Sequence, residues 1–267
     1  MPKISIVTPS YNQCAFIGAA IESVCAQNYT DYEHIIVDNC SSDSTSRVLL
    51  DYSDIRLLCE RDRGQSDALN KGFKMAKGDI IGWLNADDIY LPGVFERVAA
   101  AFRDESVDAV YGDCIFVDKN LNFKRNLISR RPSKWLSLFH CYIPSTTFFF
   151  RRKILDEGIM IDESFDITMD KEFFAHLFFT NHKLLYINEF FAKFRWHEDN
   201  KSIDTPAVRL TRFKEGVEIF NRYSGYKLPD NRFGVELYRW MFNSAKLYKA
   251  YLKRYNLHRD NYKDYLS

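Results

Sequence analysis

The chain has 267 residues and a formal net charge of +1, with 46% hydrophobic and 27% charged residues. This mixture is typical of soluble globular proteins, and 11 glycines and 7 prolines are too few for a collagen-like or low-complexity chain. No apolar run approaches the roughly 20 residues of a membrane-spanning helix. The N-terminus leads straight into the short apolar run at Ile4, whereas a signal peptide needs a longer apolar stretch and a small-residue cleavage site, so we expect a cytoplasmic protein.

The first hundred residues alternate between short apolar runs and segments with helical spacing of their apolar residues. The spacing predicts strands at 4–7, 34–37, 55–59, 80–84 and 109–111, and helices at 15–27, 44–51, 66–75 and 94–102. Apolar strands separated by helices of this length predict βαβ units around a parallel sheet.

The pattern changes in the second half of the chain. Strand-like stretches occur at 146–150, 183–187 and 190–196, an aromatic-rich helix at 170–180, and mostly helical sequence from Pro206 onward. The sequence therefore predicts one α/β domain over residues 1–205, with a mixed sheet and helices on both faces, and a helical C-terminal extension over 206–267.

The loops that follow the first four strands carry the candidate functional residues. Ligands of open α/β sheets bind beyond the carboxyl ends of the strands, and three of these four loops contain carboxylates: 38–43, 60–64 and 85–88. Acids gathered at one edge repel one another unless something positive is bound. A divalent cation is the simplest such partner.

The motifs present and absent narrow the kind of site. The chain has no G-x-G-x-x-G after the first strand, no P-loop and no G-x-S-x-G elbow. Its six cysteines are scattered without a C-x-x-C pair, which disfavours a zinc site. Oxygen ligands favour Mg²⁺ or Mn²⁺, and Mg²⁺ commonly bridges one or two carboxylates to substrate phosphates.

Four segments in order carry a resemblance to a known family. They are Ile6-Val7-Thr8-Pro9-Ser10-Tyr11-Asn12, the stretch 37–45 around Asp38, Gly64 to Gly72, and Gly78 to Asp88 with Asn85-Ala86-Asp87-Asp88 at its end. Together they resemble family 2 glycosyltransferases with the GT-A fold, over roughly residues 3–200. The resemblance implies inverting transfer of a sugar from a nucleoside diphosphate to an acceptor hydroxyl, with the nucleotide half at about 1–115 and the acceptor half at about 116–205.

The resemblance also implies roles for individual residues. Asp87 would bind the metal, with Asp88 sharing the work, although Asn85 replaces the usual first acid of the D-x-D motif. Asp38 would accept a hydrogen bond from the base, expected to be uracil. The remaining donor-binding candidates are Thr8, Pro9, Tyr11, Asp67, Asn70, Lys71, Asn85 and Ala86.

An inverting transfer needs a base to accept the acceptor proton. By the same resemblance, Asp170 is the catalytic base and Glu172 the following acid, while Met169 replaces the acid usually found before the base. A carboxylate at a helix N-terminus tends to have a lowered pKa, so a useful base there needs an apolar wall or a neighbouring acid. His197, in a stretch that resembles R-x-H-x(4)-S, would reach the metal or the diphosphate, or donate to the leaving group.

Purely structural roles are alternatives for many of these residues. Asp38 and Asp43 can cap the next helix, Asp87 and Asp88 can belong to a turn before the helix at Pro92, and Asp170 can be an N-cap. Asn70, Lys71 and His197 also occur commonly as ordinary structural residues.

The C-terminal segment differs in charge from the rest. Residues 207–267 hold 13 Lys/Arg against 6 Asp/Glu, whereas the other 206 residues hold 24 against 30. Basic and aromatic residues at near-helical spacing, from Arg239 and Trp240 through Lys246 to Tyr255, predict either a helix on an anionic membrane surface or one that packs on the catalytic domain. An acidic body without a recognition motif argues against nucleic-acid binding.

The sequence thus predicts metal-dependent transfer of a single sugar, from a donor expected to be UDP-linked, to a glycan or lipid-linked glycan in cell-surface polysaccharide synthesis. Single addition is expected because the Q-x-x-R-W motif of processive enzymes is absent. The alternatives are a nucleotidyltransferase, which would need a glycine-rich basic loop after the first strand, and a non-catalytic nucleotide-sugar-binding or scaffold protein. The location expected is the cytoplasm, at the inner face of the membrane if the C-terminal helix binds lipid.

Overall fold

The computed structural model describes residues 2–198 and 200–255, and from residue 246 onward only the backbone. The described residues form two compact units. Of the described residues, unit 1 holds 2–131, 143–161 and 183–196, and unit 2 holds 132–142, 162–182, 197–198 and 200–255. The domain boundary expected near residue 205 stays a prediction.

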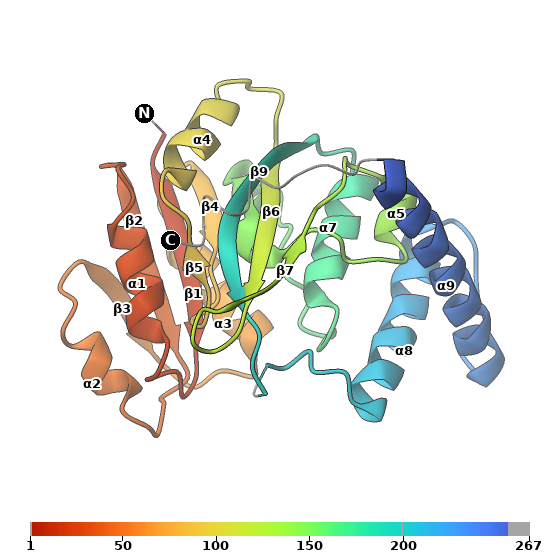
Figure 1. Ribbon diagram of the computed structural model, residues 1–267, viewed down its shortest axis with the longest axis horizontal. Helices are drawn as coiled ribbons and strands as arrows, with labels where there is room; N and C mark the ends of the chain where they lie inside the picture. Colours follow the sequence, from red (N-terminus) through yellow and green to blue (C-terminus); the bar gives the residue numbers. More distant parts are fainter. Residues whose placement is uncertain (1, 199, 256–267) are drawn as a thin grey trace. The chain divides into compact units, whose positions relative to one another are not determined.

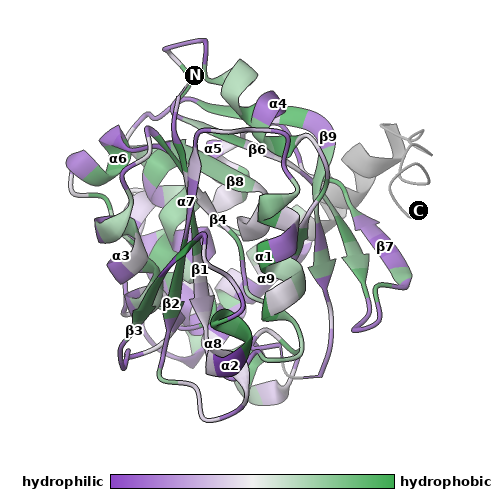
Figure 2. Cartoon of the chain, turned by 90° about the vertical axis from the view of Figure 1, so that its left-hand side faces the viewer, coloured by the Kyte–Doolittle hydropathy of each residue, from purple (hydrophilic) through white to green (hydrophobic). Residues whose placement is uncertain are grey.

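Unit 1 is built on a mixed sheet, whose strands are labelled in Figure 1 except for β8, which Figure 2 labels. Its strands in the described part of the chain are β1 (Ile4–Ser10), β2 (Tyr32–Asp38), β3 (Ile55–Cys59), β4 (Ile80–Trp83), β5 (Ile89–Tyr90), β6 (Ala109–Val117), β7 (Phe123–Leu127), β8 (Phe148–Arg151) and β9 (Leu184–Arg195). The order is β3-β2-β1-β4-β8-β6-β9-β5, with β7 beside β6. The first four strands of this order are parallel, and β8 runs antiparallel to β4 and β6. The predicted mixed α/β sheet is confirmed.

Helices cover both faces of this sheet. They are α1 (Ile17–Cys25), α2 (Thr45–Leu49), α3 (Gln65–Met75), α4 (Val94–Ala101) and α6 (Lys153–Asp156). Ile36 of β2 packs in a core cluster with residues of α1 and α2, whereas its neighbour Val37 faces Gly72 of α3. Because successive strand residues point to opposite faces, α1 and α2 cover one face and α3 the other.

Burial explains the strand patterns. All nine residues of β6 are buried, so the strand is almost continuously apolar, while β7 is exposed along most of its length and largely purple in Figure 2. The stretches expected as strands at 183–187 and 190–196 form the single strand β9, whose register against β6 shifts around Asp113. The stretch expected at 146–150 begins as a 3₁₀ turn, η1 (Ser145–Thr147), before β8.

Unit 2 is helical in its described part. Its helices are α5 (Lys134–Ser137), α7 (Met169–Phe179), α8 (Pro206–Tyr223) and α9 (Arg232–Tyr255). The start of α8 has proline at its first position and a cap from Thr205, whose hydroxyl accepts the Val208 amide at 3.2 Å.

Aromatic packing joins α9 to the rest of unit 2. Tyr238 is buried and stacks on Phe139, and Phe242 packs on His140. On the same helix, Phe233 and Trp240 are 68% and 66% exposed. The side chains expected to continue the basic aromatic stripe, Lys246 to Tyr255, lie outside the described residues. No helix within the described ranges has the length and apolarity needed to cross a membrane.

Candidate active site

The loops after β1, β2 and β3 meet at one edge of the sheet, as the parallel strand order requires. The backbone N–H of Asn12 donates to the Ser41 hydroxyl at 2.8 Å, and the backbone N–H of Asp62 donates to the side-chain oxygen of Asn39 at 2.9 Å. Asn12 has a positive φ of 53°, a conformation that asparagine tolerates better than most residues. These bonds tie the three loops into one polar surface.

Asp38 is held rigidly at the centre of this edge. It is 2% exposed, and its carboxylate accepts the Ser10 hydroxyl at 3.0 Å, the Ser41 amide at 2.8 Å and the Ser41 hydroxyl at 2.6 Å. The amide at the start of α2 is bound by Asp43 instead, at 2.9 Å from the Thr45 nitrogen. Asp43 therefore has the capping role, and Asp38 fixes the geometry of the loop.

Thr8 and Tyr11 lie at the end of β1 in contrasting surroundings. The buried Thr8 hydroxyl is 2.9 Å from Nε2 of His34. Burial lowers the pKa of His34 to about 3, so the ring is neutral at physiological pH. The ring of Tyr11 is 54% exposed, and Pro9 between them is half-buried. Tyr11 therefore offers an aromatic face to a ligand, while Thr8 is engaged inside the protein.

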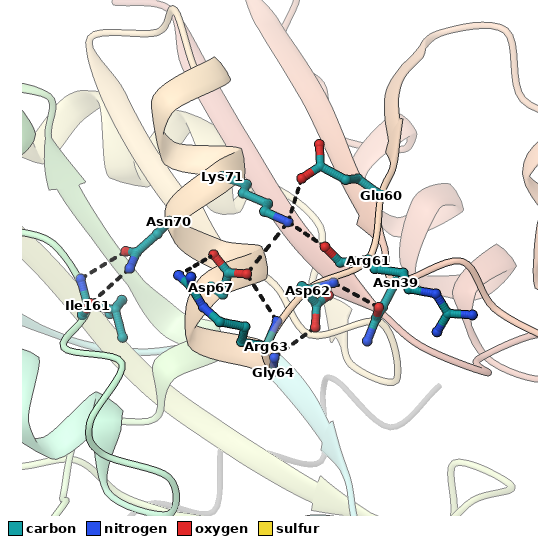
Figure 3. A network of polar contacts seen from close by, with 10 residues as sticks. All are labelled: Asn39, Glu60, Arg61, Asp62, Arg63, Gly64, Asp67, Asn70, Lys71 and Ile161. Atoms are coloured by element: carbon teal, nitrogen blue, oxygen red, sulfur yellow. Dashed lines mark hydrogen bonds and ion pairs between the residues drawn. The ribbon is translucent and has the colours of Figure 1, made fainter.

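The first turns of α3 carry a polar network that ties down the loop after β3 (Figure 3). Lys71 donates to the Arg61 carbonyl at 2.7 Å and pairs with Glu60 at 2.8 Å. Asp67 accepts the Arg63 amide at 3.0 Å and lies 3.6 Å from the Lys71 amine. Both candidate residues thus shape the loop from within.

Asn70 pairs with a segment that is distant in sequence. Its amide nitrogen donates to the Ile161 carbonyl at 2.9 Å and its oxygen accepts the Ile161 amide at 3.0 Å, as Figure 3 shows. With an exposed fraction of only 5%, Asn70 acts as a two-way clamp on the backbone.

The asparagine at the first position of the acidic motif has three side-chain partners inside unit 1. The Asn85 oxygen accepts the Trp83 indole N–H at 2.9 Å and the Gln65 amide at 3.0 Å, and its nitrogen donates to Asp88 at 2.9 Å. Ala86 packs its side chain into the core with α1, so its backbone is the part left to face a ligand. Asn85 therefore organises the loop rather than leaving a gap in it.

Asp88 is fully buried and serves the fold. Its carboxylate accepts the Arg195 amide at 2.9 Å as well as the Asn85 side chain. Burial, reinforced by the neighbouring charge of Asp87, raises the pKa of Asp88 well above its usual range. A group so enclosed is a poor ligand for a solvated ion, whereas Asp87 is half-buried and can reach one.

Arg195, at the end of β9, is the arginine of the R-x-H-x(4)-S stretch, but the sequence analysis gave it no role. It is 4% exposed, with its guanidinium 4.7 Å from the ring centre of Phe16, and it interacts electrostatically with Asp87 and Asp88. Burial lowers the pKa of Arg195, and the two acids oppose that shift. Its only sequence signal was its place two residues before His197.

The described residues contain no group of three or more acidic, histidine or cysteine side chains that could hold a metal by themselves. The side chains present still fit the expected ion, because Mg²⁺ usually takes one or two carboxylates as ligands and completes its shell with water and substrate phosphates. Asp87 supplies one hard, partly accessible carboxylate of this kind. A metal here would depend on the substrate for further ligands.

In unit 2, Asp170 lies in the first turn of α7 and is partly exposed. The Cys141 thiol donates to one carboxylate oxygen at 3.3 Å, and the Lys171 amide donates to the other at 2.7 Å. Burial raises the pKa of Asp170, against the lowering that a helix N-terminus alone would cause. The direction of this shift is the one that the sequence argument required of a useful base at a helix N-terminus.

Glu172 and His197 are also placed in unit 2. Glu172 is 1% exposed and bound by the Tyr223 hydroxyl at 2.5 Å and by Arg222 at 3.0 Å, so it anchors α7 to α8. His197 is buried, and its amide donates to the Asn200 side chain at 2.6 Å. Unit 1 brings the candidates from Thr8 to Asp88 together, and Asp170 and His197 belong to unit 2.

Residues 5–178 match the sequence model of glycosyl transferase family 2. The chain belongs to this family. The glycosyltransferase is 26% identical over 239 residues to an uncharacterized glycosyltransferase of Nostoc sp., covering 83% of this chain and 74% of that protein. It is 33% identical over 120 residues to the Escherichia coli enzyme WfgD, UDP-Glc:alpha-D-GlcNAc-diphosphoundecaprenol beta-1,3-glucosyltransferase, covering 44% of this chain and 47% of WfgD.

A solved structure has the same fold. The mannosyltransferase PcManGT of Pyrobaculum calidifontis, in complex with GDP-Man and Mn²⁺, aligns with a TM-score of 0.64 over 92% of this chain and 73% of that one, at 17% identity. At this identity the likeness shows the fold alone, and it confirms the GT-A architecture of the glycosyltransferase.

Proposed function

We propose that this glycosyltransferase transfers one sugar, with inversion, from a UDP-sugar to a glycan or lipid-linked glycan, using Mn²⁺ or Mg²⁺. The observation that carries the proposal is the edge formed by the ends of β1, β2 and β4, where the rigid Asp38, the exposed Tyr11 and the accessible Asp87 follow strands that are neighbours in the sheet. An aromatic side chain and two carboxylates suit a ligand that consists of a nucleobase, a diphosphate and a bound cation.

The donor nucleotide is assigned to the β1–β2 part of this edge. The exposed ring of Tyr11 provides a stacking face, and Asp38 provides a fixed carboxylate that can accept a base N–H. Pro9 stiffens the strand end between them. UDP is favoured because the name of the relative WfgD specifies a UDP-linked donor.

The metal is assigned to Asp87. When bound, the ion would act as a Lewis acid that stabilises the departing diphosphate. Asn85, held by Trp83 and Gln65, orients the backbone of the motif, and Arg195 stabilises the position of Asp87 electrostatically. A mannosyltransferase of the same fold is described as a Mn²⁺ complex, which supports the choice of ion.

Asp170 is assigned as the general base. It accepts the proton of the acceptor hydroxyl on a carboxylate oxygen as that hydroxyl attacks the anomeric carbon from the face opposite the leaving group. The upward shift of its pKa by burial suits this task, because a stronger base removes the proton more readily. His197 is kept as a candidate contact of the diphosphate.

The acceptor is assigned as a glycan or lipid-linked glycan of cell-surface polysaccharide synthesis. WfgD, by its name, acts on a diphosphoundecaprenol-linked sugar. The exposed Phe233 and Trp240, with the basic residues Arg232 and Arg239 nearby on α9, would allow contact with an anionic membrane from the cytoplasmic side.

The test uses the full chain, a panel of UDP-glucose, UDP-N-acetylglucosamine and GDP-mannose, and Mn²⁺, with calorimetry for binding and donor hydrolysis for turnover. Asp87→Ala is expected to lose the metal-dependent part of UDP affinity together with turnover. Asp170→Asn is expected to keep UDP affinity within about twofold and to lose at least about 100-fold in turnover.

A matched control is Asp156→Asn, which changes an exposed acid at the end of α6 and should behave as the parent protein. Metal-dependent UDP binding by Asp87→Ala would remove Asp87 from the metal site. Undiminished turnover by Asp170→Asn would remove Asp170 as the base.

A further inference from the structure

The turn that leads into α7 is bound by a carboxylate from another helix. Glu215, on α8, accepts three consecutive backbone amides, those of Asp166 at 2.7 Å, Ile167 at 3.2 Å and Thr168 at 2.8 Å. It also accepts the Thr168 hydroxyl at 2.8 Å, and it is only 8% exposed. All of these residues belong to unit 2.

This arrangement is an occupied anion site. Consecutive amides at a helix N-terminus attract negative charge, because their N–H groups point outward and the helix dipole adds to their potential. A glutamate placed there satisfies the amides and offsets the positive end of the helix. Asp170 follows two residues after Thr168, so its carboxylate shares this helix end with a second negative charge.

We propose that Glu215 is a positioning residue for the proposed catalytic base, fixing the turn that presents Asp170 and keeping the helix end from stabilising the Asp170 carboxylate. The inference rests on the role of Asp170 stated above and extends it to a residue that does not touch the substrate. Four donors bonded to one buried side chain leave that turn little freedom to move.

The other charged and titratable groups around Asp170 are consistent with this role. The Cys141 thiol and the Lys171 amide contact its carboxylate. The Lys171 amine donates to the Tyr238 hydroxyl of α9 at 2.6 Å, and burial lowers its pKa to about 7, while the charges of Asp170 and Glu215 oppose that shift. The Lys171 charge in turn lowers the pKa of Asp170. Burial raises the pKa of Asp170, and the negative charge of Glu215 would act in the same direction because it opposes the positive end of the helix.

Glu215→Gln tests the proposal, because the amide keeps the shape and one acceptor oxygen while it removes the charge. With the fastest donor of the panel and Mn²⁺, we expect the plateau kcat to fall about tenfold and the acidic limb of the kcat profile to move about half a pH unit lower. The donor KM should stay within about twofold, since the donor is bound in unit 1. The matched control is Glu236→Gln. Glu236 is an exposed acid on α9, and the one ion pair it makes among the described residues is with Arg239, at 3.6 Å.

Glu215→Asp separates charge from position, because it keeps the charge on a shorter side chain. We expect a lower kcat with an acidic limb within about 0.2 pH units of the parent, and this variant serves alone if Glu215→Gln does not fold. An unchanged kcat and pH profile in Glu215→Gln, or an equal fall in all parameters for both variants and the control, would overturn the inference. Asp170→Asn distinguishes this failure from that of the proposed function: if Asp170→Asn is inactive and Glu215→Gln is normal, only the positioning role is lost.

Discussion

His34 should make the stability of the glycosyltransferase depend on pH in a way that one substitution abolishes. The ring is 1% exposed in β2, and burial lowers its pKa to about 3 from an ordinary value near 6.5. Between these two values the unfolded chain binds a proton that the folded protein does not. Stability is therefore greatest above about pH 6.5 and falls as the pH is lowered.

The size of the effect follows from the linkage relation. Each pH unit between the two pKa values costs about 1.4 kcal/mol. Lowering the pH from 7 to 5 therefore removes about 2 kcal/mol of folding free energy through His34 alone, and the loss continues toward pH 3. This is a substantial share of the 5–15 kcal/mol typical of folded domains.

His34→Gln removes the titrating group while its side-chain amide can still bond the Thr8 hydroxyl. Urea unfolding at pH 7, 6 and 5, followed by circular dichroism and tryptophan fluorescence, gives the free-energy difference between parent and variant at each pH. We expect that difference to change by about 2 kcal/mol in favour of the variant between pH 7 and 5. Thr8→Val, which removes the partner but keeps the ring, should retain the pH dependence. A difference that is constant within about 0.5 kcal/mol over this range would refute the reasoning.

Two further substitutions test local packing. Asn85→Asp introduces the acid usual at this motif position, but it loses the amide donor to the buried Asp88 and places a second carboxyl 2.9 Å from it. We expect about 2–4 kcal/mol of destabilisation by thermal unfolding and no gain in turnover. A variant as stable as the parent would contradict the hydrogen-bond assignment. Gly72→Ala would place a methyl group of α3 against the side chain of Val7. An overpacking cost of about 1–3 kcal/mol should outweigh the helix propensity of alanine, and the double variant with Val7→Ala should recover part of the lost stability. A single variant more stable than the parent would show that β1 accommodates the methyl group without strain.

The sequence predicted the strands and the edge where the loops meet because these depend on local patterns. A β-branched apolar run such as Ile35–Val37 indicates a buried strand, and parallel strands necessarily end at the same edge. The two stretches around Asn188 and Glu189 were separated in the sequence analysis because polar residues interrupted the apolar pattern. The structure joins them as β9, since strand pairing with β6 continues through a shifted register.

The partners of the candidate residues were beyond such patterns. Asn70 bonds Ile161, 91 residues away, and the Glu215 carboxylate reaches the Thr168 amide 47 residues away. Neither pairing leaves a periodic signal in one sequence, because it is set by how distant segments pack. The family motif indicated that Asn70 and Lys71 matter, but only the contacts show that they hold the loop after β3 and the backbone at Ile161.

The electrostatic argument for a cation changes once Arg195 is placed. From the sequence, acids gathered at one edge called for a positive partner, and a metal was the simplest choice. The structure supplies part of that charge from the protein: a buried guanidinium interacts with both Asp87 and Asp88, and Asp88 has a strongly raised pKa. The acids are therefore compatible with the fold without an ion. A metal would be bound instead when a diphosphate adds its own negative charge beside Asp87, so that donor and ion should bind cooperatively.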